Sequence, residues 1–345
     1  MKKFWSKDWG SSEPPEIKDK DGSSWGWKKV SALGVLIVAL CLGVLGIWWS
    51  FEPDLADVYQ QLDEQTDEYQ GVAGASTTLA LQLAMQTLLQ KPGGLLSNDL
   101  MPPGRWVDNV PNWEYGVIVQ SRDLAKAMRE GFSRSQAQSR EDPALAIVEP
   151  RFNFDHRSWI LPSSEGEYRE GLEELQDYLD RLSGQAEGDT RFFVRADNLQ
   201  RWLRSVENRL GSLSQRLGAS VAGSRVDLSF QSVEELSEDE GDLSQTSWNV
   251  IDDIFFEARG STWAIALFLT AIEKDFGAVL DDKNARVSLQ QIIRELEAAQ
   301  EPLFGPIVLN GRGFGIFANH SLVIASYVAR AHAATIELRT LLING

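Results

Sequence analysis

The sequence predicts a mainly α-helical protein, with one N-terminal transmembrane helix followed by a multi-helix soluble domain. Three observations predict this class. Residues 30–49 form an uncharged apolar run, later segments repeat apolar residues every three to four positions, and Pro or Gly clusters separate those segments. Two short aromatic pieces, 151–155 and 191–195, could pair as a small two-stranded β ribbon or reflect a weak duplication.

Residues 1–29 are predicted to be a disordered cytoplasmic tail. They contain two Gly/Ser patches, a Pro-Pro pair and mixed charge, a composition that cannot bury a core. Seven basic and five acidic residues give this tail a charge of +2, which leaves −19 for the rest of a chain with net charge −17. Its tryptophans and lysines could lie against the inner leaflet or form a short docking motif.

Residues 30–49 are predicted to be a retained signal anchor. A helix of these 20 residues, rising about 1.5 Å per residue, spans the roughly 30 Å hydrocarbon core of a bilayer. A cleaved signal peptide does not fit, because the charged region before the run is long and no small-residue cleavage site follows it. Aromatic residues flank both ends, as expected at membrane interfaces: Trp25, Trp27, Trp48, Trp49 and Phe51.

The charges beside this run predict its orientation. Lys28 and Lys29 precede it, whereas only acidic residues follow closely: Glu52, Asp54 and Asp57. The positive-inside rule then places the tail in the cytoplasm and residues 50–345 in the periplasm of a bacterium. The expected location is therefore the inner membrane, crossed once.

Ala39 and Gly43 form a small-xxx-small pair within the span, which could let two spans associate weakly. Such pairs are common by chance in runs rich in Gly and Ala.

Apolar periodicity and end signals predict helices over about 54–70, 77–91, 112–138, 164–182, 197–218, 247–277, 284–299 and 320–342. The nearly uncharged segment 77–91 could be a second span. Gln82, Gln86 and Gln90 form a polar stripe along it, so a core helix is the better interpretation. Ser164 and Glu167 match a capping box at the start of the fourth helix.

Charge and residue usage exclude several classes of function. A body this acidic repels nucleic-acid phosphates and anionic lipid headgroups, so no nucleic-acid partner is expected. The single cysteine, Cys41, lies in the span, which leaves the rest without a thiolate ligand or nucleophile. No histidine pair has helical ligand spacing, and the acidic segment 233–245 does not match a calcium loop. No metal and no cofactor is predicted.

The candidate catalytic residues are His156, Asp155 and Arg157, in the aromatic stretch "FNFDHRSW". Loops of this composition often carry function. In extended backbone, however, adjacent side chains point to opposite faces, so the sequence adjacency of the acid and the histidine does not make a dyad. His332, by contrast, lies between Val328 and Ile336 at helical spacing and is interpreted as a core histidine.

The glycine-rich stretch "VLNGRGFGIFANHS" at 308–321 resembles a phosphate loop only superficially. It lacks the Gly-Lys-Ser/Thr triplet and the preceding strand that nucleotide-binding loops need. We interpret it as a tight turn before the last helix. Backbone N–H groups there can hold an anion, which makes Arg312 and His320 the candidate ligand-binding residues.

Three stretches carry a resemblance to a known family: "GLLSNDLMPPGRWVDNVPNWEYGV", "EPRFNFDHRSWILPSSEGEY" and "FFVRADNLQRWL". With the single N-terminal span, the chain resembles a family of proteobacterial membrane-anchored proteins catalogued as a domain of unknown function. The resemblance covers nearly all of the chain after the tail. It implies a Gram-negative envelope protein and transfers no catalytic residues.

The leading functional hypothesis is an interaction or scaffold component of the cell envelope, with the inner membrane and envelope proteins as partners. Two alternatives remain. One is an envelope enzyme acting on peptidoglycan or another glycan through the His156 loop. The other is a periplasmic ligand-sensing module.

Overall fold

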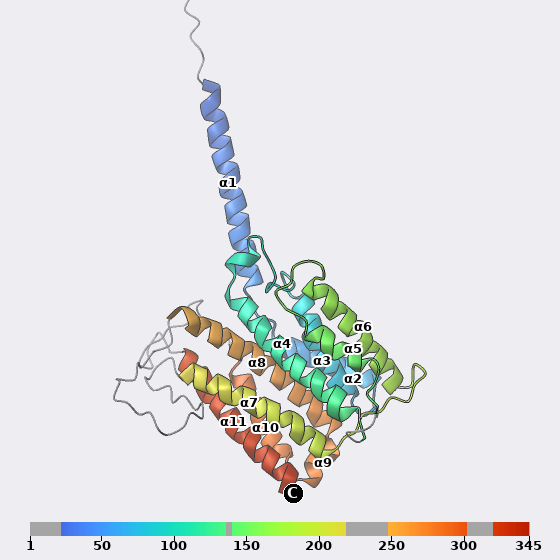
Figure 1. The fold of residues 1–345 in the computed structure, drawn as a ribbon. Coiled ribbons are helices and arrows are strands. Elements are labelled where there is room, and N and C mark those ends of the chain that lie inside the picture. Colours follow the sequence, from blue (N-terminus) through green and yellow to red (C-terminus); the bar gives the residue numbers. More distant parts are fainter. Residues whose placement is uncertain (1–21, 136–139, 219–247, 302–319, 345) are drawn as a thin grey trace, which may run out of the picture. The chain divides into compact units, whose positions relative to one another are not determined.

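The computed structural model describes residues 22–135, 140–218, 248–301 and 320–344, and in these ranges every regular element is a helix (Figure 1). The chain divides into two units, residues 1–45 and 46–345. The helices are α1 (Gly22–Trp49), α2 (Leu55–Glu68), α3 (Ala75–Gln90), α4 (Asn109–Ala127), α5 (Leu145–Phe152), α6 (Ser164–Leu182), α7 (Ala196–Gly218), α8 (Trp248–Asp275), α9 (Gly277–Asp282), α10 (Arg286–Ala298) and α11 (His320–Asn344), with short turns η1 (Gly104–Trp106) and η2 (Met128–Phe132). The predicted mainly α-helical class is confirmed.

Helix α1 contains the one segment of the described residues that is long and apolar enough to cross a membrane. This segment, Lys29–Trp49, has 21 residues and a mean hydropathy of 2.7, and none of its most apolar stretch is buried by protein. Helix α3 is different, because nearly all of it is buried in the helical body, where Gln82 Nε2 donates to Gln176 Oε1 at 2.9 Å. The prediction of a core helix at 77–91 is confirmed.

Helix α8 lies at the centre of the body and packs against α2, α3, α4, α7, α10 and α11. Its closest approach is to α4, where two glycines let the backbones touch. A Cβ added to Gly260 would lie 1.9 Å from the carbonyl oxygen of Trp113, and one added to Gly116 would lie 2.3 Å from the carbonyl oxygen of Glu257. Beside this crossing the rings of Trp113 and Trp263 meet edge to face, with centroids 5.3 Å apart.

Helix α7, expected over 197–218, buries its apolar stripe in full: Leu199, Trp202, Leu203, Val206, Leu210, Leu213 and Leu217. It packs against α11, whose buried face the sequence predicted less well. His332 is half-buried over Gly211 of α7 and lies outside the fully buried core, and Ile336 is 43% exposed. The buried face of α11 runs through Val328, Ala331, Thr335, Leu338 and Leu342 instead.

The predicted β ribbon is wrong. Phe152 belongs to helix α5, and residues 191–195 form an irregular segment before α7. The aromatic side chains of the two pieces pack into different parts of the core, Phe152 against Tyr168 and Phe192 against Phe276. The second segment finds its backbone partner in η2, where the N–H of Phe193 donates to the carbonyl of Phe132 at 2.6 Å.

Two predicted helix ends also change. The helix expected over 112–138 begins earlier, as α4, and ends in the π-helical turn η2 at Phe132. At α6 the N-cap is Ser163, whose Oγ accepts from Gly166 N at 3.2 Å, rather than Ser164. The reason is that the Ser164 hydroxyl is engaged by the preceding loop.

Candidate functional site

The loop that carries His156 joins α5 to α6 and is held to the body at its start by α4. Arg122 of α4 donates from Nε to the carbonyl of Phe152 and from Nη2 to the carbonyl of Phe154, each at 2.7 Å. Tyr168 of α6 adds a hydrogen bond from its hydroxyl to the same Phe154 carbonyl at 3.2 Å. Charge-assisted bonds from a half-buried guanidinium fix this end of the loop firmly.

The rest of the loop closes on itself through serines. Ser164 Oγ donates to the carbonyl of Asp155 at 2.7 Å and lies 2.9 Å from the carbonyl of Ser158. Ser158 Oγ in turn donates to the carbonyl of Pro162 at 2.7 Å. The loop is therefore internally bonded from 155 to 164, with its tip held in one conformation.

The three predicted catalytic residues lie together in this loop but make different contacts. The imidazole of His156 packs against the ring of Tyr115 of α4 in a tilted arrangement, with ring centroids 5.1 Å apart and an interplanar angle of 37°. Its Nδ1 is 3.9 Å from Asp155 Oδ1, which is too long for a hydrogen bond. Asp155 Oδ1 instead accepts from the backbone N–H of Arg157 at 3.0 Å, and the Asp155 carboxylate is 67% exposed.

Burial lowers the pKa of His156 below its ordinary value, and the nearby positive charges of Arg157 and Arg122 lower it further. A neutral imidazole packed on a tyrosine ring anchors the loop to α4. A catalytic role for His156, Asp155 and Arg157 stays a prediction.

The other predicted pair cannot be placed beside this loop. Arg312 and the side chain of His320 lie outside the described residues, and of the two only the backbone of His320, at the start of α11, is described. Their role as ligand contacts also stays a prediction.

A buried charge pair that sequence reasoning missed lies under the α3–α4 connection. Lys91 Nζ and Glu114 Oε1 are 2.7 Å apart, with side chains 1% and 0% exposed. Glu114 also accepts from the backbone N–H groups of Leu96 and Ser97, both at 2.8 Å, and Lys91 donates to the carbonyl of Gly94 at 2.6 Å. Every charge is thus paired and hydrogen-bonded, as a buried ion pair requires.

This network fixes the α3–α4 connection and links it to the His156 loop. Asn98 Nδ2 donates to the carbonyl of Ser158 at 3.0 Å and to Glu165 Oε2 at 2.8 Å. Burial raises the pKa of neighbouring Asp99, and the charges of Glu114 and Glu165 raise it further. The two loops therefore form one surface, which we call the paired loops, residues 96–108 and 155–163. Figure 1 shows both connections at the same end of the helical body.

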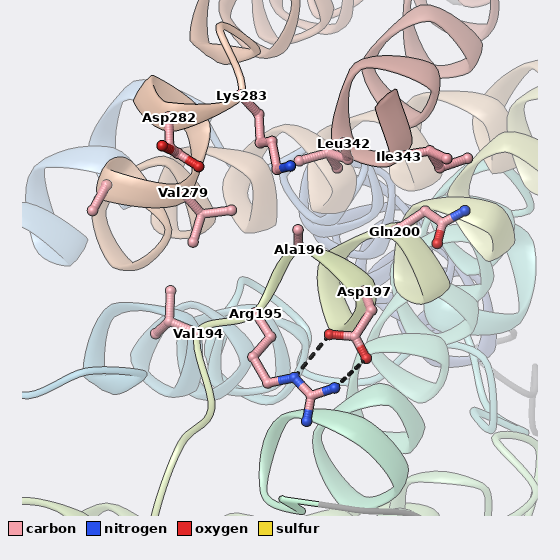
Figure 2. A pocket seen from close by; sticks show the side chains of 11 residues that line it. Val194, Arg195, Ala196, Asp197, Gln200, Val279, Asp282, Lys283, Leu342 and Ile343 are labelled. Atoms are coloured by element: carbon pink, nitrogen blue, oxygen red, sulfur yellow. Dashed lines mark hydrogen bonds and ion pairs between the residues drawn. The ribbon is translucent and has the colours of Figure 1, made fainter. Parts of the chain in front are cut away.

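A depression with a volume of about 710 Å³ lies between the start of α7, α9 and the end of α11, as Figure 2 shows. Its lining mixes apolar side chains such as Val279 and Ile343 with Asp282 and Lys283. Arg195 and Asp197 on its rim pair with each other, with Nη2 and Oδ2 2.7 Å apart. It is open and lies at the far end of the body from the paired loops (Figure 1), so it does not share a cleft with His156.

Comparison with known proteins is informative at the level of family only. Neither the curated proteins nor the solved structures include a significant match. A family model matches residues 20–345, which are almost the whole chain. The chain belongs to the bacterial family described as "Uncharacterized protein conserved in bacteria (DUF2333)".

Proposed function

We propose that this chain is a single-pass inner-membrane protein whose helical body lies in the periplasm and serves as an interaction or scaffold component of the cell envelope. The apolar helix ending at Trp49 supports the anchor. The lysines before it and the acidic residues after it support the orientation.

The observation that carries the proposal is the way the end of the span joins the body. Glu52, three residues after α1, forms an ion pair with Arg259 of α8. Arg259 Nη2 and Glu52 Oε2 are 2.6 Å apart, and the side chains are 7% exposed for Arg259 and 14% exposed for Glu52. Arg259 also donates to the carbonyls of Ala299 and Glu301, both at 3.1 Å. Trp49 packs against the small cluster of Leu96, Val107 and Val110.

Trp49 is therefore part of the fold of the body, in addition to the interfacial position expected from sequence. The last turn of the span, from Gly46 to Trp49, belongs to the same compact unit as the body, which supports a role beside the membrane surface.

A topology experiment tests the compartment. We expect a C-terminal alkaline phosphatase fusion to the full chain to be active, because that enzyme folds only after export. A fluorescent protein that matures only in the cytoplasm should be dark at the same position and bright at the N-terminus. The reverse pattern would overturn the orientation.

A second experiment tests the scaffold role. The full chain, cross-linked in intact cells and purified, should recover other envelope proteins above the level obtained with an unrelated single-pass protein of equal abundance. Recovery at background level would remove the main content of the proposal.

The depression at the α7–α9–α11 end favours ligand sensing as a second candidate. Sensing requires a binding event in the body to be reported by the cytoplasmic tail. If the protein is a sensor, we expect deletion of residues 2–24 to cause the same cellular defect as loss of the whole protein. If the protein is a scaffold, we expect this deletion to cause no defect. The enzyme alternative depends on His156 and is tested separately below.

A further inference from the structure

The body surface beside the end of α1 is formed by the first of the paired loops. A Cβ placed on Gly46, in the last turn of α1, would lie 3.5 Å from Pro103 Cβ. One placed on Gly93 would lie 2.8 Å from the ring of Trp49. Gly46 and Trp49 lie in the last turn of the apolar span and belong to the same compact unit as this loop, so the loop around Pro103 lies beside the end of the span.

The paired loops expose large apolar side chains at this place. Their exposed fractions exceed one half: Leu100 52%, Met101 73%, Trp106 63%, Trp159 53%, Ile160 61% and Leu161 90%. These six side chains come from segments some sixty residues apart that Asn98 joins by its hydrogen bonds to Ser158 and Glu165. A soluble surface rarely gathers so many large apolar groups without covering them.

The tip of the second loop holds its apolar residues outward at a conformational cost. Leu161 has φ 58°, in the left-handed region that disfavours a branched side chain. Hydrogen bonds from Ser158 and Ser164 close the loop beneath this tip. Strain that presents a leucine to solvent indicates a partner for that leucine.

The paired loops carry charges of both signs, with two arginines and three carboxylates: Arg105, Arg157, Asp99, Asp108 and Asp155. Although the chain outside the tail carries −19, each loop places an exposed arginine next to or near an exposed tryptophan: Arg105 with Trp106, and Arg157 with Trp159. Tryptophan prefers the headgroup level of a bilayer, and arginine binds lipid phosphate through paired N–H donors. Trp48 and Phe51, at the end of the span, are 55% and 65% exposed and are expected at the headgroup level too.

We propose that the paired loops insert Leu100, Met101, Trp106, Trp159, Ile160 and Leu161 into the leaflet from which α1 emerges. Lipid is thus the partner of this surface. The inference rests on the proposed membrane anchor, and it adds a second attachment of the body to the same bilayer.

Spin labels in the full chain, reconstituted in lipid nanodiscs, measure this insertion. Replacing Cys41 by serine and Leu161 by cysteine gives a single label at the loop tip. We expect this label to be more accessible to dissolved oxygen than to a water-soluble nickel complex, the order found inside a bilayer. The matched control is Val287→Cys, since Val287 is 71% exposed on α10, away from the paired loops, and its label should show the opposite order.

A label on native Cys41 separates this inference from the anchor itself. If the Cys41 label lies in hydrocarbon while the Leu161 label behaves like the Val287 label, the anchor stands and loop insertion is overturned. If neither lies in lipid, both proposals fail. A Leu161 label protected in native membranes but exposed in nanodiscs also overturns the inference, because a protein would then cover the loops.

Discussion

Arg259 and Glu52 form a nearly buried ion pair across 207 positions of sequence, tying the first residues after the span to the central helix of the body. The guanidinium also satisfies carbonyl groups just beyond the end of α10, so one side chain joins three parts of the chain. Because the pair is shielded from water, removing one partner leaves the charge of the other buried and uncompensated.

We expect Glu52→Ala to lower the free energy of unfolding by about 3 kcal/mol, since Arg259 stays buried without its carboxylate. Denaturation of the full chain in a mild detergent measures this. Asp63→Ala is the matched control, because Asp63 and its partner Lys274 are 67% and 34% exposed, and its loss should stay below about 1 kcal/mol. Equal losses in the two variants would contradict the buried pair.

Gly260→Ala should lower the free energy of unfolding by about 3 kcal/mol or more, because the new Cβ would overlap the Trp113 carbonyl and force α4 and α8 apart. Gly218→Ala provides the comparison. A Cβ at Gly218, the last residue of α7, meets nothing within 4 Å, so that variant should stay within about 1 kcal/mol of wild type. Thermal or chemical unfolding distinguishes them, and a silent Gly260→Ala would argue against the close crossing.

Leu161→Asn should keep or raise the stability of the fold by up to about 1 kcal/mol, because asparagine tolerates φ 58° better than leucine. The same change should weaken contact of the loop with lipid. Ile160→Asn, one residue away and 61% exposed, should weaken lipid contact without the gain in stability. Unfolding in detergent measures the stability of each variant. The accessibility of a spin label on the loop in nanodiscs measures its contact with lipid. A destabilised Leu161→Asn would show that the tip is not strained.

Local pattern predicted much of the fold, for a physical reason. Helix α7 buries one apolar stripe, mainly against α11, so its periodicity reports its environment directly, and every apolar position of the stripe is buried. Helix α3 is buried on nearly all sides, and its three glutamines still indicated which edge was polar. The aromatic pieces at 151–155 and 191–195 failed because packing into separate core regions outweighed their strand propensity.

The site residues were harder to predict, because their roles depend on contacts between distant segments. Nothing near Glu114 in the sequence indicates that Lys91 and the N–H groups of Leu96 and Ser97 surround it. Nothing in the sequence around Asn98 indicates that its side chain donates a hydrogen bond to the carbonyl of Ser158. The aromatic neighbours of His156 in the sequence marked it as a candidate, but its packing against Tyr115 could not be predicted.

His156 provides the last prediction, which concerns pH. Its pKa is lowered in the fold, by burial first and by Arg157 and Arg122 next, while Asp155 opposes them. The unfolded chain therefore binds a proton near pH 6.5 that the folded chain binds only at lower pH. The contribution of His156 to stability is full above about pH 6.5 and is lost as pH falls from there through the folded pKa.

An NMR titration should resolve this, since the chain has 3 histidines. His156→Phe keeps a ring on Tyr115 without a titrating group, so its stability should fall less between pH 7 and pH 5 than that of wild type. A His156 pKa at or above 6.5 would contradict the half-buried packing of the imidazole against Tyr115. The same variant decides the enzyme alternative. If His156→Phe folds normally and supports wild-type function in cells, the histidine is an anchor of the loop, whereas a folded but inactive variant would give it a catalytic role.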